Sequence, residues 1–448
     1  MTRAHAGLLL AVAIALLVGH LLRDSLGYAI RAEDGTYEGD IVHYVYWTRL
    51  VTLGGIQAAY GGQWPETYAV YPPIALYPYQ AVGNLYRWLE DPSFDVQRAQ
   101  QNLWLREAIK FVALTWHLLT GAAIYLLVRG RSGAPTAAVA SALYVANPAA
   151  LYDTAHWAQP DGAHSLFTVL AIGVLGMGRV ALAWAAMALA ALSKPQAWSV
   201  LPLLALATVQ VRGPIGLVSA VLSAAAVSVV VVAPFIVTGK LGELLSLPGA
   251  VASVLPVVSA DAHNVWWLIG AVRGFDPLFT PDLTRFIGPL TFRTAALILV
   301  GAQFVVGYWL FWTRRIGLAE AAALGALGWF VCTTQAHENH LIFALPLLAL
   351  AWPTRRSLLV VFAVLSVTVL SNMAVHDQLF LEALGRDLND PLVGGLRLVN
   401  AAANVLCFVG WSLARITSQH DAVRDTPDGQ QEPESHPIGR RAQLQRTP

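Results

Sequence analysis

The chain has 448 residues, of which 56% are hydrophobic and only 12% are charged. Soluble domains carry about 25% charged residues, so a chain of this length with half that charge has too little polar surface for a water-exposed globule. The composition excludes a soluble enzyme and a disordered protein, and it predicts a polytopic membrane protein. The net charge of +1 is uninformative as a total, and we expect no nucleic-acid partner.

Twelve apolar segments follow one another along the chain, and we expect them to form an all-α transmembrane bundle. Several are shorter than the ~20 residues that a straight span needs, so we predict about 10–13 spans. This membrane module covers residues 1–416, and residues 417–448, which lack apolar periodicity, form a predicted disordered tail. The apolar segments are residues 6–22, 107–128, 135–150, 163–178, 180–193, 196–211, 214–237, 292–312, 317–333, 340–352, 356–374 and 392–415.

The arginines predict the orientation of the bundle. With the N-terminus inside, each short inner loop contains arginine, as at Arg129, Arg179, Arg212 and Arg355. The short outer loop 151–162 contains neither Arg nor Lys. The positive-inside rule therefore places both termini in the cytoplasm for an even number of spans.

Two of the outer loops are long, residues 24–104 and residues 238–291. Within the first loop, residues 41–53 and 74–89 carry apolar side chains at helical spacing. We predict that both segments are amphipathic helices that lie on the membrane surface.

The first cluster of polar residues lies in the first outer loop and contains Glu33, Asp34, Glu38 and Asp40. A solvated acidic loop is one interpretation. Asp40, however, opens a helix of apolar and aromatic residues, which puts a carboxylate at the water–membrane boundary. Asp40 is then either the N-cap of that helix or a base whose pKa is tuned by partial burial.

The second cluster is an outer turn that contains His156, Gln159, Asp161 and His164. Two histidines and a carboxylate are metal-ligand types, but their spacing matches neither HxxxH nor HExxH. We therefore favour a hydrogen-bonding turn that lines a cavity over a metal site.

Two further clusters lie between apolar segments. Lys194, followed by Gln196, is a cation on the outer side that suits a lipid phosphate, and a snorkelling lysine is the alternative. His337, Glu338 and His340 form the other cluster. Polar groups at membrane depth usually mark function, and a short hydrated loop is the alternative here.

The sequence contains no Walker motif, no Rossmann fingerprint and no GxSxG motif. ATP-driven transport and a nucleotide-sugar-binding fold are therefore disfavoured. Any group donor must reach the outer face by another route, such as a lipid carrier.

In this order and on one side of the membrane, the clusters resemble the GT-C superfamily of polyprenyl-phosphate-sugar-dependent glycosyltransferases. Within it they resemble the dolichyl-phosphate-glucose-dependent glucosyltransferases of the lipid-linked N-glycan pathway. The likeness covers residues from about 1 to 416, with Asn339 where the family has Lys and Pro195 inserted between Lys and Gln. The six motifs are Gly39-Asp40 ahead of Trp47, Tyr71-Pro72-Pro73-Ile74, the turn of His156, Gln159 and Asp161, Lys194 with Gln196, Ala262 with Asn264 and Trp266, and His337-Glu338-Asn339.

The resemblance implies a GT-C fold and an inverting transfer with Asp40 as the general base. Asp40 would deprotonate an acceptor hydroxyl that attacks the anomeric carbon of a polyprenyl-phosphate-linked hexose, glucose or mannose. The leaving phosphate gains negative charge, and its predicted ligands are Lys194, His337, Glu338 and His340. The predicted cavity-lining residues are Glu38, Tyr71, His156, Gln159, Asp161, Gln196, Asn264 and Trp266. No pyrophosphate takes part, so we expect neither a metal nor another cofactor.

We therefore expect a multi-pass cell-membrane glycosyltransferase whose active site faces the outside. Its partners would be a polyprenyl-phosphate sugar, membrane lipids and a glycan, lipid or protein acceptor. The alternative is a polytopic transporter or lipid-linked-sugar flippase, which would place polar residues within its spans. A non-catalytic scaffold would tolerate the loss of Asp40. The position of the polar clusters at outer helix ends favours the enzyme.

Overall fold

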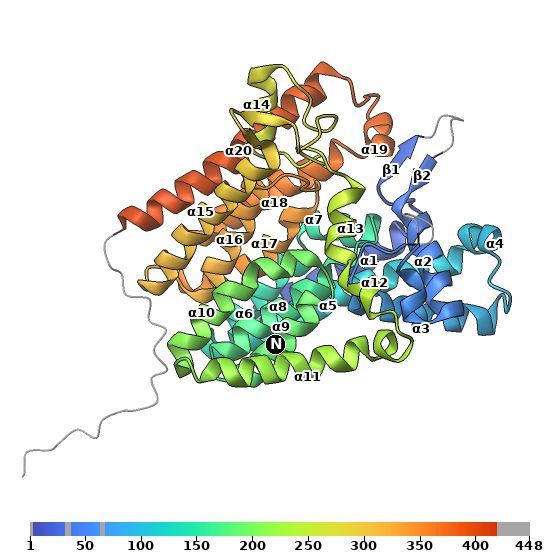
Figure 1. The fold of residues 1–448 in the computed structure, drawn as a ribbon, viewed down its shortest axis with the longest axis horizontal. Coiled ribbons are helices and arrows are strands. Elements are labelled where there is room, and N and C mark those ends of the chain that lie inside the picture. The colour runs from blue at the N-terminus through green and yellow to red at the C-terminus, as the bar shows by residue number, and fades with distance from the viewer. Residues whose placement is uncertain (1–2, 32–36, 63–67, 419–448) are drawn as a thin grey trace, which may run out of the picture.

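The computed structural model describes residues 3–31, 37–62 and 68–418 (Figure 1). The described part is a helical bundle with two small antiparallel two-stranded sheets. This all-α architecture confirms the predicted fold class. The acidic residues Glu33 and Asp34, the side chain of Glu38 and residues 419–448 of the predicted tail lie outside the described part.

Each of the twelve predicted apolar segments overlaps a helix of the bundle. Five helices among the described residues are long and apolar enough to cross a membrane, namely α1 (Arg3–Leu21), α5 (Leu103–Ser132), α11 (Gly216–Val237), α15 (Phe292–Trp312) and α20 (Pro391–Thr417). The shorter helices of the bundle are α6 (Ala134–Val145), α8 (Asp161–Leu175), α9 (Val180–Ala191), α10 (Leu201–Arg212), α16 (Leu318–Cys332), α17 (Ala344–Ala351) and α18 (Leu358–Ala374). The chain is thus a multi-pass membrane protein, and the number of spans stays a prediction.

Local sequence signals set the ends of these helices. Helix α5 begins after Asn102, whose Oδ1 accepts a hydrogen bond of 2.8 Å from the backbone N–H of Leu105. It ends at Ser132, and the cap residue Gly133 has φ +80°, a conformation that costs glycine no steric strain. Helix α20 starts with Pro391, whose missing N–H would have no partner in a first turn.

The first outer loop folds into its own helical layer beside the bundle. It contains strands β1 (Ala29–Arg31) and β2 (Tyr37–Gly39), helices α2 (Asp40–Gly54), α3 (Pro73–Leu89) and α4 (Val96–Gln101), the 3₁₀ helix η1 (Ile56–Ala59), and an aromatic-rich core. The predicted helices over residues 41–53 and 74–89 correspond to α2 and α3. Figure 1 shows α2, α3 and α4 on the side of the molecule opposite α15 and α20.

The second outer loop also contains helices, which the sequence analysis did not predict. They are α12 (Leu241–Leu245), α13 (Leu247–Val254) and α14 (Val265–Arg273), and strands β3 (Arg285–Ile287) and β4 (Leu290–Thr291) follow. Backbone hydrogen bonds join this loop to the segment before α17. Gln335 donates to the Val257 carbonyl at 3.2 Å, and Ala260 donates to the Ala336 carbonyl at 3.0 Å. The two segments therefore form one continuous wall.

The arginines of the predicted inner loops meet at one end of the bundle. Arg131 donates to the Gly173 carbonyl at 3.1 Å, and Arg212 donates to the Gly178 carbonyl at 3.4 Å. Arg355 reaches the Arg315 carbonyl at 3.2 Å. The loops that contain the four polar clusters lie at the opposite ends of the same helices. The positive-inside rule then predicts that the arginine end faces the cytoplasm.

This orientation predicts the reactivity of two introduced cysteines. Ser253 in α13 and Ser132 at the end of α5 are both exposed. In a background with Cys332 and Cys407 replaced by Ala, Ser253→Cys should react with an impermeant maleimide in intact cells. Ser132→Cys should react only after permeabilisation. The reverse pattern would invert the orientation and move every polar cluster to the cytoplasmic side.

Candidate active site

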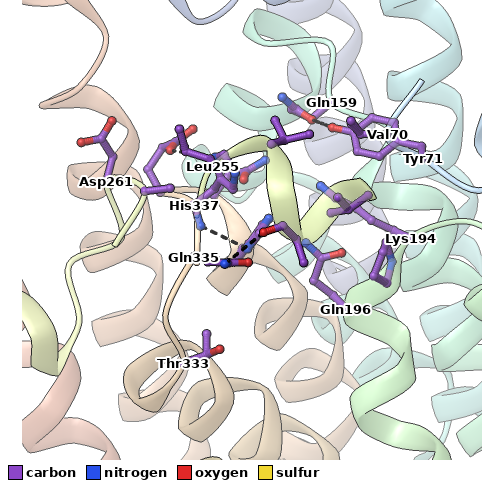
Figure 2. Close-up of a pocket in the computed structure, with 18 of the residues that line it drawn as sticks. Val70, Tyr71, Gln159, Lys194, Gln196, Leu255, Asp261, Thr333, Gln335 and His337 are labelled. Atoms are coloured by element: carbon purple, nitrogen blue, oxygen red, sulfur yellow. Dashed lines mark hydrogen bonds and ion pairs between the residues drawn. The ribbon is translucent and has the colours of Figure 1, made fainter. Parts of the chain in front are cut away.

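A cavity of about 650 Å³ opens at the end of the bundle opposite the arginines, a size that suits a small-molecule site. Its walls come from the first outer loop, the start of the 3₁₀ helix η3 (Pro195–Val200), α13, and residues 333–340 (Figure 2). Residues from segments far apart in the sequence thus meet in one space. The predicted site residues in its lining are Asp40, Tyr71, Gln159, Lys194, Gln196, His337, Glu338 and His340.

Asp40 is the first residue of α2, and Gly39 is the N-cap. The interpretation of Asp40 as the N-cap is therefore wrong. Its backbone N–H donates to the Tyr28 carbonyl at 3.1 Å. A Cβ on Gly39 would lie 2.2 Å from the Leu26 carbonyl oxygen, so only glycine allows this close approach. The pairing of strands β1 and β2 therefore places the Asp40 carboxylate at the cavity wall.

The Asp40 carboxylate is held by an ordered chain of side chains. Tyr71 donates its hydroxyl proton to Gln159 Oε1 at 2.8 Å, and Gln159 Nε2 donates to Asp40 Oδ2 at 2.7 Å. Burial raises the pKa of Asp40 to about 7, against the lowering effects of the Gln159 hydrogen bond and the Lys194 charge. A carboxylate with this pKa is suited to proton transfer near neutral pH.

Lys194 pairs with Asp161 inside the protein, and both side chains are at least 95% buried. The ammonium also lies 5.2 Å from the centre of the Tyr71 ring. Asn339 Nδ2 donates to Asp161 Oδ2 at 3.3 Å and to Asp153 Oδ1 at 3.1 Å. An ammonium has three hydrogens, so the pairing with Asp161 leaves donors on Lys194 for a ligand in the cavity.

The histidines of the fourth cluster have different surroundings. The His337 side chain is 43% exposed, and its Nδ1 lies 3.8 Å from Glu338 Oε2. The His337 backbone N–H donates to His340 Nδ1 at 3.1 Å. His340 therefore carries its ring proton on Nε2 when it is neutral, and Nε2 is the atom through which it can donate to a ligand.

The cavity also has an extended apolar wall, built by η3, α13, α15 and α16. Among its members, Trp198 is 37% exposed. This wall begins beside Lys194 and Gln196 in sequence and in space. Its residues are Trp198, Val251, Val254, Leu255, Val300, Phe304 and Trp329.

Four of the predicted cavity-lining residues do not line the cavity: His156, Asp161, Asn264 and Trp266. Asp161 pairs with Lys194 behind the wall, and the other three contact protein groups elsewhere. His156 Nε2 bonds Asp377 Oδ2 at 2.8 Å. Asn264 caps α14 through a hydrogen bond of 3.0 Å from Trp266 N. The Trp266 ring is fully buried in an apolar cluster. These predictions fail for a common reason. The polar atoms of these side chains bond to other protein groups, and the spacing of residues in the sequence does not reveal those partners.

The structure adds residues that the sequence analysis missed. Tyr28 and Asp261 line the cavity, and Asp153 lies behind it. Asp377 Oδ2 accepts hydrogen bonds from the Tyr152 hydroxyl at 2.6 Å and from Trp157 Nε1 at 3.2 Å. The only sequence signal for Asp377 is its place directly after an apolar segment.

No protein-family model matches the chain, and no curated protein matches it. Solved structures do match it. ArnT from Cupriavidus metallidurans in the apo state is 14% identical, with 93% of this chain and 77% of ArnT covered and a TM-score of 0.47. ArnT bound to undecaprenyl phosphate is 14% identical, with 91% and 76% covered and a TM-score of 0.50.

An oligosaccharyltransferase from Archaeoglobus fulgidus, tethered to an acceptor peptide with the NVT sequon, is 15% identical. The match covers 91% of this chain and 55% of that one, with a TM-score of 0.38. ArnT and this oligosaccharyltransferase are GT-C superfamily members. The similarity to undecaprenyl-phosphate-bound ArnT supports a GT-C-type fold for this chain, and a fold alone does not establish an activity.

The buried Lys194–Asp161 pair makes a prediction about stability. Lys194→Met and Asp161→Asn each leave one buried charge without its partner, which costs about 3–5 kcal/mol. The double variant should lose less than the sum of the two. Lys240→Met is a matched control, because Lys240 pairs with Glu243 at 3.5 Å on the surface, where a pair contributes about 0–1 kcal/mol. Denaturant unfolding in detergent measures all four, and additive losses would contradict the pairing.

Proposed function

We propose that the protein is an integral membrane inverting glycosyltransferase. It moves a hexose from a polyprenyl-phosphate carrier to an acceptor at the outer face of the membrane. The observation that carries the proposal is the arrangement of the cavity. The carboxylate of Asp40, the ammonium of Lys194 and an apolar wall border one space at one end of a membrane bundle.

The donor fits the side of the cavity that contains Lys194 and His340. Lys194 offers a cation to the phosphate, and His340 offers an Nε2–H donor. The apolar wall from Trp198 to Phe304 offers a surface for the first isoprene units of the carrier. The structure of ArnT with undecaprenyl phosphate supports a ligand of this chemical class.

The chemistry follows from the Asp40 carboxylate. Asp40 takes the proton of the acceptor hydroxyl as its oxygen attacks the anomeric carbon. The bond from that carbon to the phosphate oxygen breaks, and its electron pair stays on the phosphate, where Lys194 stabilises the growing charge. A single displacement inverts the configuration at the anomeric carbon. The resemblance to dolichyl-phosphate-glucose-dependent glucosyltransferases supports glucose as the hexose, and mannose is the alternative.

The test separates an enzyme from a flippase. The purified protein in vesicles is given a panel of radiolabelled polyprenyl-phosphate hexoses with a membrane-lipid extract as acceptor. A transferase releases polyprenyl phosphate and labels an acceptor. Movement of the intact donor across the vesicle membrane without cleavage would favour the flippase and overturn the proposal.

Replacing Asp40 by Asn should remove a factor of about 10²–10⁴ from the transfer rate at saturating donor. Asn can still accept the Gln159 hydrogen bond, but it cannot take a proton. Asp95→Asn is the matched control, since Asp95 caps α4 in the same loop and Asn caps a helix about as well as Asp. A folded Asp40→Asn protein with a rate within about threefold of wild type would end the base assignment.

The transfer rate should depend on pH through Asp40. The base works only when it is ionised, so the rate should rise with pH through about 7 and level off above it. Gln159→Met removes a hydrogen bond that lowers the pKa of Asp40, so the inflection should move to higher pH. Rate–pH profiles at saturating donor measure the shift. An inflection that moves to lower pH, or does not move, would show that Gln159 does not lower the pKa of the catalytic base.

A further inference from the structure

A row of buried polar side chains stands behind Asp261 on the cavity wall. Asp261 Oδ1 lies 3.1 Å from His376 Nδ1. The second ring nitrogen of His376, Nε2, lies 2.9 Å from His263 Nε2. His263 Nδ1 in turn lies 2.9 Å from Asn400 Nδ2. Because the residues come from two loops and from α20, this row exists only in the folded protein.

The hydrogen positions in this row follow from its far end. Asn400 Nδ2 lies 2.9 Å from the Thr368 carbonyl, which fixes Nδ2 as a donor. Its other hydrogen points to His263 Nδ1, which must accept it. His263 then donates from Nε2 to His376 Nε2, and His376 donates from Nδ1 to Asp261. The end of the row is a neutral donor aimed at a carboxylate.

The backbone of Asp261 has a left-handed conformation. Its φ is +66°, a region that Asp and Asn enter more readily than most residues other than glycine. Asn372 supports it, since Asn372 Nδ2 donates to the Asp261 carbonyl at 2.7 Å and Asn372 Oδ1 accepts from His263 N at 2.9 Å. Such geometry persists where the surroundings determine it, and it clusters at functional sites.

Asp261 contributes a carboxylate to its part of the cavity lining. Burial raises the pKa of Asp261 to about 6 against the opposing Arg397 charge, so the carboxylate is mostly ionised at neutral pH. Burial, Asp261 and Glu338 together raise the pKa of Tyr28. Figure 2 shows Asp261 and Lys194 on opposite sides of the cavity. The donor phosphate is therefore repelled from Asp261, and a group that donates hydrogen bonds is attracted.

We propose that Asp261 binds hydroxyl groups of the acceptor, so that the acceptor presents a sugar to Asp40, and that His376 is the positioning residue that orients Asp261. The proposal rests on the proposed function and narrows its acceptor to a glycan or glycolipid end. A carboxylate accepts two hydroxyl hydrogens at once, which suits the neighbouring hydroxyls of a sugar ring. Tyr28 also lines the cavity, and its hydroxyl is near enough to Asp261 for that carboxylate to raise the Tyr28 pKa.

Steady-state kinetics with the reconstituted full chain test the proposal. The donor is a polyprenyl-phosphate hexose, and the acceptor probes are octyl glucoside and octyl mannoside. Asp261→Asn should raise the acceptor KM at least tenfold and leave the donor KM within about twofold. Asn tolerates the left-handed backbone, so the change removes only the charge. Asp276→Asn, in the same loop outside the cavity lining, is the control and should match wild type.

Two variants of His376 test the positioning role. His376→Leu should raise the acceptor KM as Asp261→Asn does. His376→Asn should restore most of the wild-type acceptor KM, because its Nδ2 takes the place of the histidine Nδ1 donor. Undecaprenyl phosphate binding, followed by tryptophan fluorescence, identifies the folded variants.

The outcomes separate this proposal from the activity on which it rests. A wild-type protein that releases no polyprenyl phosphate from any donor overturns both. Release by the wild type with an unchanged acceptor KM in Asp261→Asn overturns the Asp261 proposal alone. A rise in donor KM instead of acceptor KM does the same, because it assigns Asp261 to the donor.

Discussion

A charge that is buried away from water is stable only when an opposite charge lies beside it. The end of the bundle that contains the cavity depends on one such pair, Lys194 and Asp161. Asp161 begins α8, and Lys194 directly precedes η3. Asn339 attaches a third segment to the same carboxylate. Because Gln159 lies two residues before Asp161, the same pair places its side chain within hydrogen-bonding distance of Asp40. The candidate base is thus positioned by a charge pair that it does not itself contact.

The cavity combines acidic and basic side chains with one wall that has neither. The cation lies beside the apolar wall, and the carboxylates of Asp261 and Glu338 lie in the same lining as Tyr28. A transporter needs its polar groups midway along broken spans so that both faces can reach them. Here the candidate groups gather at one end of the helices, an arrangement that suits a reaction on one face.

The sequence predicts the helices well because few structures other than helices can cross the lipid bilayer. A bilayer leaves no backbone group without an internal partner, so every long apolar run must become a helix. The helical spacing of apolar residues also predicted α2 and α3. This spacing does not predict which side chains contact one another. His156 pairs with Asp377, more than 200 positions away, and no local pattern distinguishes that contact from a cavity-lining position. Asp261 lies in a loop without periodicity, and its side-chain partner His376 comes from another segment.

The short length of α8 has a consequence for the depth of the cavity in the membrane. Fifteen residues rise only about 22 Å, whereas the hydrocarbon core of a bilayer is about 30 Å thick. The far end of α8 contacts Arg131 at the arginine face. An upright α8 with that end at one edge of the hydrocarbon core would leave Asp161 about 8 Å short of the opposite edge. Under the proposed function, a lipid phosphate that reaches Lys194 moves below the headgroup level and loses part of its hydration. In the proposed reaction water is the competing nucleophile, so an acceptor that fills the cavity would also keep water away from the donor sugar.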